Sequence, residues 1–239
     1  MTGGIIAAGA GSRLRQAGWT VPKPLVEVAG LPLVGRVIQN FRSAGITSLT
    51  IIFNEDERDC ERWVRLQYSD LDLRIIVKTT ASSFESFREV CALLGPGPAL
   101  ISTVDAWCAE GDFVEFVQTV RQRPVDATVL AVTSLVADER PLWVSLDAVG
   151  RVTSLGGKSG ALVTAGMYAV PERVRRLSAT SGSGRLREFL AQLVARGEPV
   201  YGVIVPNVVD VDRAEDVALA EAMARKQRRE SVKPLGVVR

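Results

Sequence analysis

Histidine is absent from this 239-residue sequence. Its absence excludes Ser-His-Asp and Cys-His catalytic sites and histidine-ligated metal sites. The cysteines are only three, Cys60, Cys91 and Cys108, and none belongs to a Cys-x-x-Cys pair. A thiolate zinc site or a thioredoxin-type dithiol is therefore not expected. Such sparse cysteine usage is typical of a reducing compartment, so we expect a cytoplasmic location.

Long apolar runs are also lacking, since none approaches the roughly 18 residues of a membrane span. The first residues, Met1 to Gly4, include no basic residue of the kind that opens a secretory signal. The charge is nearly balanced, with 29 Lys and Arg against 27 Asp and Glu. The basic excess is concentrated near the C-terminus rather than over the body, which argues against a nucleic-acid partner. We expect one domain over residues 1–226, a solvated basic tail over 227–239, and no membrane partner.

Apolar runs alternate with segments of helical spacing along the first half of the chain. Runs of this kind predict strands at 4–8, 49–53, 73–77, 99–103 and 127–132, with helices at 33–44, 56–68, from 83 onward and at 113–120. Strands that are nearly all apolar and alternate with helices are typical of a parallel sheet covered on both faces. The expected fold is therefore a single-domain, Rossmann-like three-layer α/β sandwich with a mostly parallel sheet.

The second half of the chain is less regular. We expect a hairpin around the turn at 147–150, a strand at 161–170, a helix at 184–196, a strand at 200–205 and a helix at 214–225. This half would complete a cleft next to the first. Ligands of open α/β sheets bind outside the carboxyl ends of the strands. That rule directs attention to Gly9–Arg13, Thr79–Ser83, Asp105 and Asp210.

A glycine-rich loop, Ala-Gly-Ala-Gly-Ser-Arg-Leu, follows the first predicted strand. Gly9 and Gly11 allow close approach of a ligand to the backbone, and free N–H groups in such a loop bind anions. Arg13 adds a planar fork of donors suited to phosphate. A P-loop would need Lys after the second Gly. A dinucleotide fingerprint would need Gly in place of Leu14, which argues against an oxidoreductase.

Lys23 stands between two prolines in the segment Val-Pro-Lys-Pro-Leu. Pro22 and Pro24 restrict the backbone around it to an extended form. A lysine held in this way, shortly after an anion-binding loop, is interpreted as a fixed positive charge that faces a ligand.

Residues 4–14 and 22–33 together resemble the opening of the nucleotidyltransferase superfamily. This superfamily includes the sugar-1-phosphate nucleotidyltransferases and the MobA-like NTP transferases. The combination of Gly-x-Gly-Ser-Arg-Leu with Pro-Lys-Pro-Leu carries the resemblance. It implies the nucleotide-diphospho-sugar transferase type of fold, Mg²⁺ as cofactor, and two substrates, an NTP and a small phosphorylated acceptor such as a sugar-1-phosphate.

The resemblance also assigns roles to residues. Arg13 and the loop backbone would hold the β- and γ-phosphates, Lys23 would meet the α-phosphate, and Lys158 would orient the acceptor phosphate. Asp105 and Asp210 would bind Mg²⁺, with Asp212 as the alternative to Asp210. The nucleotide would contact Ala7, Ala8, Gly9, Gly11, Ser12, Thr80, Ser82 and Ser83.

The chemistry of the residues agrees with these roles. Asp105 and Asp210 each follow an apolar strand, and carboxylates at one sheet edge suit Mg²⁺. Helix capping is the competing role, for Asp105 and above all for Asp212, which precedes the helix expected from Ala214. A phosphate nucleophile is already an anion, so the transfer needs positioning and electrostatic stabilisation rather than a histidine base.

Other functions stay open from the sequence. The acceptor could be phosphocholine, a phosphonate or another small phosphorylated compound used with CTP. A nucleotide-binding regulator without catalysis would be expected to have lost Arg13, Lys23 or Asp105, and all three are present. The sequence leaves the nucleobase, the pathway and the oligomeric state open.

Overall fold

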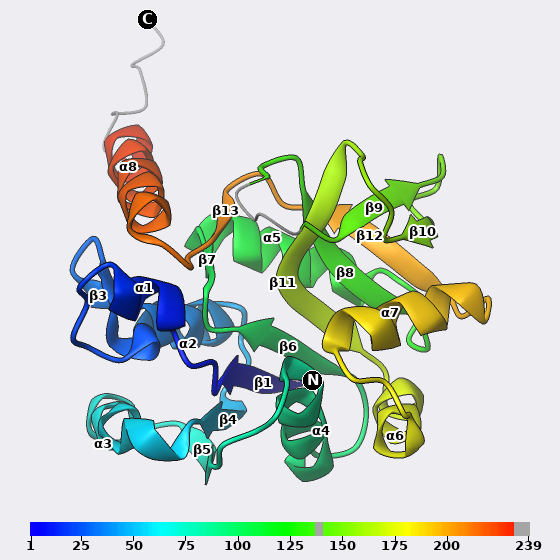
Figure 1. Cartoon of the computed structure of the whole chain (residues 1–239). Helices are drawn as coiled ribbons and strands as arrows, with labels where there is room; N and C mark the ends of the chain where they lie inside the picture. Colours follow the sequence, from blue (N-terminus) through cyan, green and yellow to red (C-terminus); the bar gives the residue numbers. More distant parts are fainter. Residues whose placement is uncertain (137–140, 232–239) are drawn as a thin grey trace, which may run out of the picture.

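The computed structural model describes residues 1–136 and 141–231 (Figure 1). Within these residues a nine-stranded mixed sheet has the order β10-β9-β11-β6-β1-β4-β5, with β8 pairing β11 and β12 pairing β8. The strands are β1 (Thr2–Ala7), β4 (Ser48–Phe53), β5 (Asp72–Val77), β6 (Ala99–Thr103), β8 (Thr128–Thr133), β9 (Trp143–Leu146), β10 (Val152–Leu155), β11 (Leu162–Val170) and β12 (Val200–Ile204). Strands β6, β1, β4 and β5 are parallel, whereas β11 runs antiparallel to β6.

Two short antiparallel ladders lie outside the main sheet. Strand β2 (Glu27–Val28) pairs β3 (Leu31–Pro32), and β7 (Ala106–Cys108) pairs β13 (Val208–Asp210). The helices are α1 (Ser12–Gln16), α2 (Leu33–Ser43), α3 (Arg58–Gln67), α4 (Ser83–Leu93), α5 (Glu110–Arg121), α6 (Glu172–Thr180), α7 (Leu186–Ala195) and α8 (Ala214–Ser231).

The sheet separates two hydrophobic cores. Successive side chains of a strand point to opposite faces. Accordingly Ile5 and Ala7 join the core under α2, α3, α5 and α8, while Ile6 and Ala8 join the core under α4, α6 and α7. The all-apolar first strand is explained by this burial on both sides. The predicted three-layer α/β fold with a mostly parallel sheet is confirmed.

Several elements were not expected from the sequence. They are α1, α6, the strands of the two short ladders and a 3-10 turn at Lys23–Leu25, most of which are too short to show a periodic pattern. The extended backbone expected around Lys23 is therefore wrong, because the carbonyl of Lys23 accepts a hydrogen bond from the N–H of Val26 at 3.1 Å. Helix α8 continues to Ser231, beyond the predicted end at residue 225, and the Arg228 side chain donates to the carbonyl of Ala29 in the β2–β3 turn at 3.2 Å. The first residues of the expected tail are therefore helical. Residues 232–239 lie outside the described residues.

None of the described helices combines the length and the apolar character needed to cross a membrane.

Candidate active site

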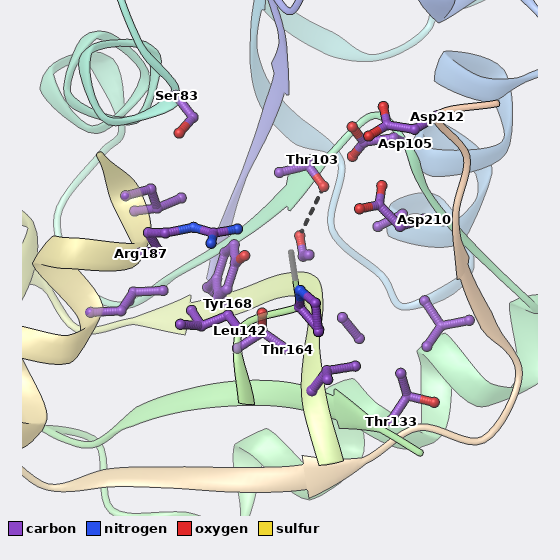
Figure 2. A pocket seen from close by; sticks show the side chains of 18 of the residues that line it. Ser83, Thr103, Asp105, Thr133, Leu142, Thr164, Tyr168, Arg187, Asp210 and Asp212 are labelled. Atoms are coloured by element: carbon purple, nitrogen blue, oxygen red, sulfur yellow. Dashed lines mark hydrogen bonds between the residues drawn. The ribbon is translucent and has the colours of Figure 1, made fainter. Parts of the chain in front are cut away.

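A cavity of about 420 Å³ opens at the carboxyl ends of β1 and β6, beside β11 and the start of α7 (Figure 2). Its lining includes Arg13 from the glycine-rich loop and Ser83 from the start of α4. It also includes Asp105, Asp210 and Asp212. The edge of the sheet that the strand pattern selected is therefore the edge that carries the cavity.

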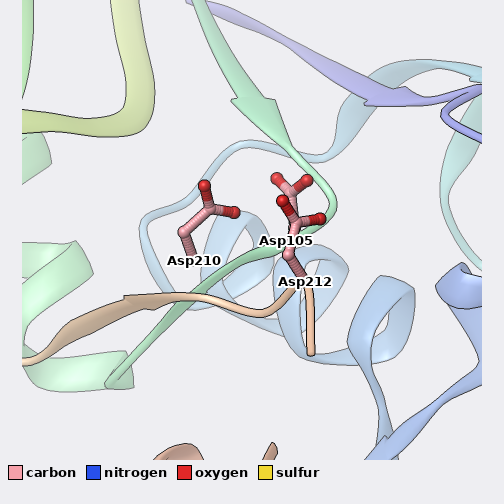
Figure 3. A group of neighbouring side chains, drawn as sticks. All are labelled: Asp105, Asp210 and Asp212. Atoms are coloured by element: carbon pink, nitrogen blue, oxygen red, sulfur yellow. The ribbon is translucent and has the colours of Figure 1, made fainter. Parts of the chain in front are cut away.

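The β7–β13 ladder joins carboxylates that are distant in the sequence. Asp210 pairs with Ala106 across this ladder, and the N–H of Val211 donates to the carbonyl of Asp105 at 2.9 Å. Figure 3 shows the side chains of Asp105, Asp210 and Asp212 gathered together. One carboxylate oxygen from each lies within 4.8 Å of the other two. Three carboxylates at this spacing are a donor set that suits a hard divalent cation. Both candidates for the second metal ligand thus belong to one cluster.

Lys23 lies against this cluster. Its ammonium Nζ donates to Asp105 Oδ2 at 2.7 Å and also to Asp212 Oδ1, and its side chain is only 6% exposed. Burial alone would lower the pKa of Lys23, but attraction by Asp105, Asp212 and Asp210 outweighs it and raises the pKa. The lysine is therefore charged throughout the physiological range. The interpretation of Lys23 as a fixed positive charge is consistent with this geometry.

The carboxylate of Asp105 is held in its charged form. Burial would raise its pKa, but the charge and hydrogen bond of Lys23, with a hydrogen bond from Thr103, lower it below the ordinary carboxyl range. Arg13 supplies a second cation, because its Nη1 donates to Asp212 Oδ2 at 2.6 Å. At this end of the cavity, three carboxylates therefore lie close to two cations, Lys23 and Arg13.

Asp212 does not cap helix α8 with its side chain. That role belongs to Asp216, whose Oδ2 accepts hydrogen bonds from the backbone N–H groups of Asp212 at 3.0 Å and Arg213 at 2.8 Å. The capping alternative for Asp212 is therefore wrong. Its carboxylate is instead directed toward Arg13 and Lys23.

The two glycines of the loop have different surroundings. Gly11 has a φ of 58°, and a Cβ added there would lie 2.9 Å from the Cβ of Lys23. A side chain would meet both an unfavourable conformation and the lysine. A Cβ added at Gly9 would meet no atom within 4 Å. The fold itself thus requires glycine at position 11 and leaves open space at position 9.

The polar residues at the start of α4 are partly explained by local structure. Ser82 caps the helix, since its Oγ accepts from the backbone N–H of Glu85 at 3.3 Å. The Oγ1 of Thr80 lies 2.6 Å from the Oγ of Ser86. Of the serines and threonines assigned to the nucleotide here, Ser83 is the one among the residues that line the cavity.

The wall of the cavity opposite the carboxylates combines hydroxyl, apolar and basic side chains. Figure 2 shows Thr164 and Tyr168 of β11 beside Arg187 of α7 and Leu142. Tyr168 is buried, and burial together with the charges of Asp210 and Asp105 raises the pKa of its hydroxyl. The phenol therefore stays neutral and can donate a hydrogen bond.

Strand β11 bends along its length, and its pairing with β8 shifts in register between Thr164 and Tyr168 (Figure 1). Gly166 has a φ of 70°, and a Cβ there would lie 2.5 Å from Thr103 Oγ1. Only glycine allows β11 to approach β6 this closely. The bend places Tyr168 on the cavity wall across from Asp105 and Asp210.

A family model describes most of this architecture. Residues 3–197 match the MobA-like NTP transferase domain. The chain belongs to this family. The resemblance carried by the glycine-rich loop and the Pro-Lys-Pro-Leu segment is thereby confirmed.

Two curated relatives differ in the compounds that their names give. The glucose-1-phosphate thymidylyltransferase of Actinoplanes sp. is 29% identical over 181 residues, which are 72% of this chain and 56% of that protein. The CMP-5'-(3-aminopropyl)phosphonate synthase of Streptomyces rubellomurinus is 25% identical over 184 residues, 72% of this chain and 28% of that protein. The chain therefore spans about half of the length of the first relative and less than a third of the second.

A solved structure shows the same fold. The inositol-1-phosphate CTP transferase from T. maritima superposes with a TM-score of 0.80 at 18% identity, covering 94% of this chain and 95% of that chain. At this identity the likeness concerns the architecture alone.

The predicted site residues separate into three groups. Arg13, Ser83 and the three aspartates line the cavity, and Lys23 contacts Asp105 and Asp212. The other residues assigned to the nucleotide are not in the cavity lining: Ala7, Ala8, Gly9, Gly11, Ser12, Thr80 and Ser82. Lys158 is exposed in the connection between β10 and β11 and is also not among the described residues that line the cavity. Its acceptor role stays a prediction from the family resemblance.

Arg187 is a cavity residue that no sequence motif singles out. It lies in the first turn of α7, and its charge acts on Tyr168. The one available signal was an arginine at the start of a helix that follows the Ser-Gly-rich segment 178–184.

Proposed function

We propose that this protein is a Mg²⁺-dependent nucleotidyltransferase. It would transfer a nucleoside monophosphate from an NTP to a sugar-1-phosphate and release pyrophosphate. The observation that carries the proposal is the meeting of Asp105, Asp210 and Asp212 with Lys23 and Arg13 at one end of a cavity. The cavity continues beyond them to a second wall, where an acceptor can be bound.

The three carboxylates fit Mg²⁺ by their chemistry and spacing, and we assign Asp105 and Asp210 as its ligands with Asp212 beside them. When bound there, Mg²⁺ would supply positive charge to the phosphate oxygens and to the departing pyrophosphate.

The cationic residues of the chain perform complementary tasks. Backbone N–H groups of the loop around Gly9 and Ser12, together with Arg13, would hold the β- and γ-phosphates. Lys23 would compensate charge at the α-phosphate as the acceptor approaches, because its buried ammonium is already held in place by Asp105. Positioning and charge compensation are sufficient for this reaction, since the attacking phosphate needs no base.

For the acceptor we propose a site on the opposite wall. Arg187 has the fork of donors that suits a phosphate, and the neutral hydroxyl of Tyr168 can donate to the same group. Arg187 thus takes the role that the family resemblance gives to Lys158. The same role for Lys158 remains a prediction from the family resemblance, because Lys158 is not in the cavity lining.

A smaller, less hydroxylated acceptor is the second candidate. Leu135, Leu142, Val163 and Leu190 line the cavity together with the hydroxyl groups of the opposite wall. Apolar side chains bind alkyl groups better than the hydroxyls of a sugar. This lining favours a cytidylyltransferase acting on phosphocholine, a phosphonate or a similar compound. A regulator that binds nucleotide without catalysis is less well supported, because the complete set of charged residues is assembled.

The test is pyrophosphate release. The protein is incubated with Mg²⁺, one of ATP, GTP, CTP, UTP or dTTP, and a panel of sugar-1-phosphates with phosphocholine and 2-aminoethylphosphonate. We expect release that requires one NTP and one acceptor together, which would name both substrates. Binding of an NTP without release across the panel would favour the regulator. If no NTP binds in the presence of Mg²⁺, the proposal is wrong.

The two loop glycines give a matched pair of variants. Gly11→Ala is expected to lower the free energy of unfolding by about 1–2 kcal/mol, because alanine is strained at this φ and its Cβ meets Lys23. Gly9→Val should leave stability nearly unchanged and weaken NTP binding, because its side chain fills the space proposed for the phosphates. Denaturant unfolding and NTP titration measure the two effects. Unchanged NTP affinity of Gly9→Val would contradict the assignment of the open space to the substrate.

A further inference from the structure

We propose that Asp212 is a positioning residue that makes binding of a polyphosphate depend on a divalent cation. This inference rests on the proposed function and deepens it, since it concerns how the same site selects metal-complexed NTP over the free anion. Asp212 is the carboxylate shared by both cations: one oxygen accepts from Arg13 and the other from Lys23. It therefore holds the groups that would otherwise attract phosphate.

The charges around Asp212 determine whether a polyphosphate can bind at this end of the cavity. An incoming polyphosphate without metal would have to compete with Asp212 for Arg13, whose Nη1 lies 2.6 Å from Asp212 Oδ2. It would also approach Asp105 and Asp210, whose charges repel it at short range. A divalent cation compensates the same carboxylates. Arg13 can then exchange Asp212 for phosphate without leaving a negative charge uncompensated.

The structure around Asp212 allows its carboxylate to exchange one partner for another. Its backbone N–H is held by Asp216, so the main chain is anchored independently of the carboxylate. Its side chain is 33% exposed, against 25% for Asp105. Lys23 would keep Asp105 as a partner if Asp212 turned away. Asp212 can thus change partners while the rest of the cluster stays in place.

The test uses inorganic tripolyphosphate, a probe that carries the polyphosphate without base or ribose. Its affinity is measured by calorimetry for the full-length protein and for Asp212→Asn, in EDTA and in Mg²⁺. Because the variant removes the charge that neutralises Arg13 and Lys23, we expect about tenfold tighter binding in EDTA and a smaller gain on adding Mg²⁺. Glu215→Gln is the matched control, since it removes a nearby charge that is 70% exposed and faces Arg213.

A second variant separates this role from a structural one. Adding Arg13→Ala to Asp212→Asn should abolish most of the gain in EDTA, because Arg13 is a cation that pairs with Asp212. Thermal unfolding confirms that each variant is folded. Loss of structure would not tighten anion binding, so a gain supports the proposal.

Two negative results have different meanings. If the unmodified protein binds Mg²⁺ and an NTP while Asp212→Asn gains no affinity for tripolyphosphate in EDTA, the inference is overturned and the proposed function stands. If the unmodified protein binds no NTP with Mg²⁺, the proposed function fails and the inference fails with it.

Discussion

Asp105→Asn is expected to lower turnover by about a hundredfold to a thousandfold while the fold is retained. The substitution keeps the shape of the side chain but removes the charge that would bind Mg²⁺. It also removes an acceptor that Lys23 contacts at 2.7 Å, so the ammonium loses part of its orientation. Both effects act at the proposed reacting phosphate. Turnover is measured by pyrophosphate release with the substrates that the panel identifies.

Asp70→Asn is the matched control for this experiment. Asp70 forms an ion pair with Arg42 at 2.9 Å on the surface, and both side chains are more than half exposed. It should change turnover by less than about twofold. Turnover of Asp105→Asn within a few-fold of the unmodified protein, with unchanged Mg²⁺ dependence, would remove Asp105 from the site.

Lys23→Met is the second substitution with a large expected effect. It replaces a buried ammonium by an apolar side chain of similar length and leaves Asp105 and Asp212 without their shared partner. We expect turnover to fall about a hundredfold or more. The free energy of unfolding at pH 7 should fall by about 1–3 kcal/mol, moderated by the partial exposure of the carboxylates.

The pH dependence gives a more specific signature. In the unmodified protein Lys23 lowers the pKa of Asp105, so this carboxylate stabilises the fold above its unfolded pKa and loses that contribution as the pH falls. Without Lys23, burial and the neighbouring carboxylates raise the pKa, and protonation then relieves repulsion. The stability difference between the two proteins should therefore shrink as the pH falls from 7 toward the carboxyl range.

Denaturant unfolding at several pH values measures this difference. Lys78→Met provides the control, because Lys78 also pairs with two carboxylates, Glu85 and Glu89, but at an exposed position. Its effect on stability should be small at every pH. A stability difference for Lys23→Met that stays constant with pH would show that packing, rather than charge compensation, is the main contribution of Lys23.

The amino-acid sequence predicts most strands of the sheet and most of the helices that cover it. Apolar runs that are buried on both sides predicted the strands of the sheet, and β6 (Ala99–Thr103) begins and ends as expected. Local chemistry also identified the glycine-rich loop and Lys23. These signals are strong because burial on both faces and the conformational freedom of glycine act on contiguous residues.

The assembly of the site depends on contacts between segments that are far apart in the sequence. The β7–β13 ladder joins Asp105 to Asp210 and Asp212, and its short strands have too few residues for a periodic pattern. The capping of α8 by Asp216 could not be separated from capping by Asp212 in the sequence, since both are aspartates near the helix start.

The position of the residues on the cavity wall proposed for the acceptor also depends on packing between distant segments. Arg187 reaches the cavity because α7 packs on the sheet beside β11, whereas Lys158 lies exposed outside the cavity lining. Local sequence records the propensity of a segment and the chemistry of its residues. Strand pairing and helix packing determine which distant side chains meet. For that reason the arrangement of charged residues in this site could not be predicted from local sequence.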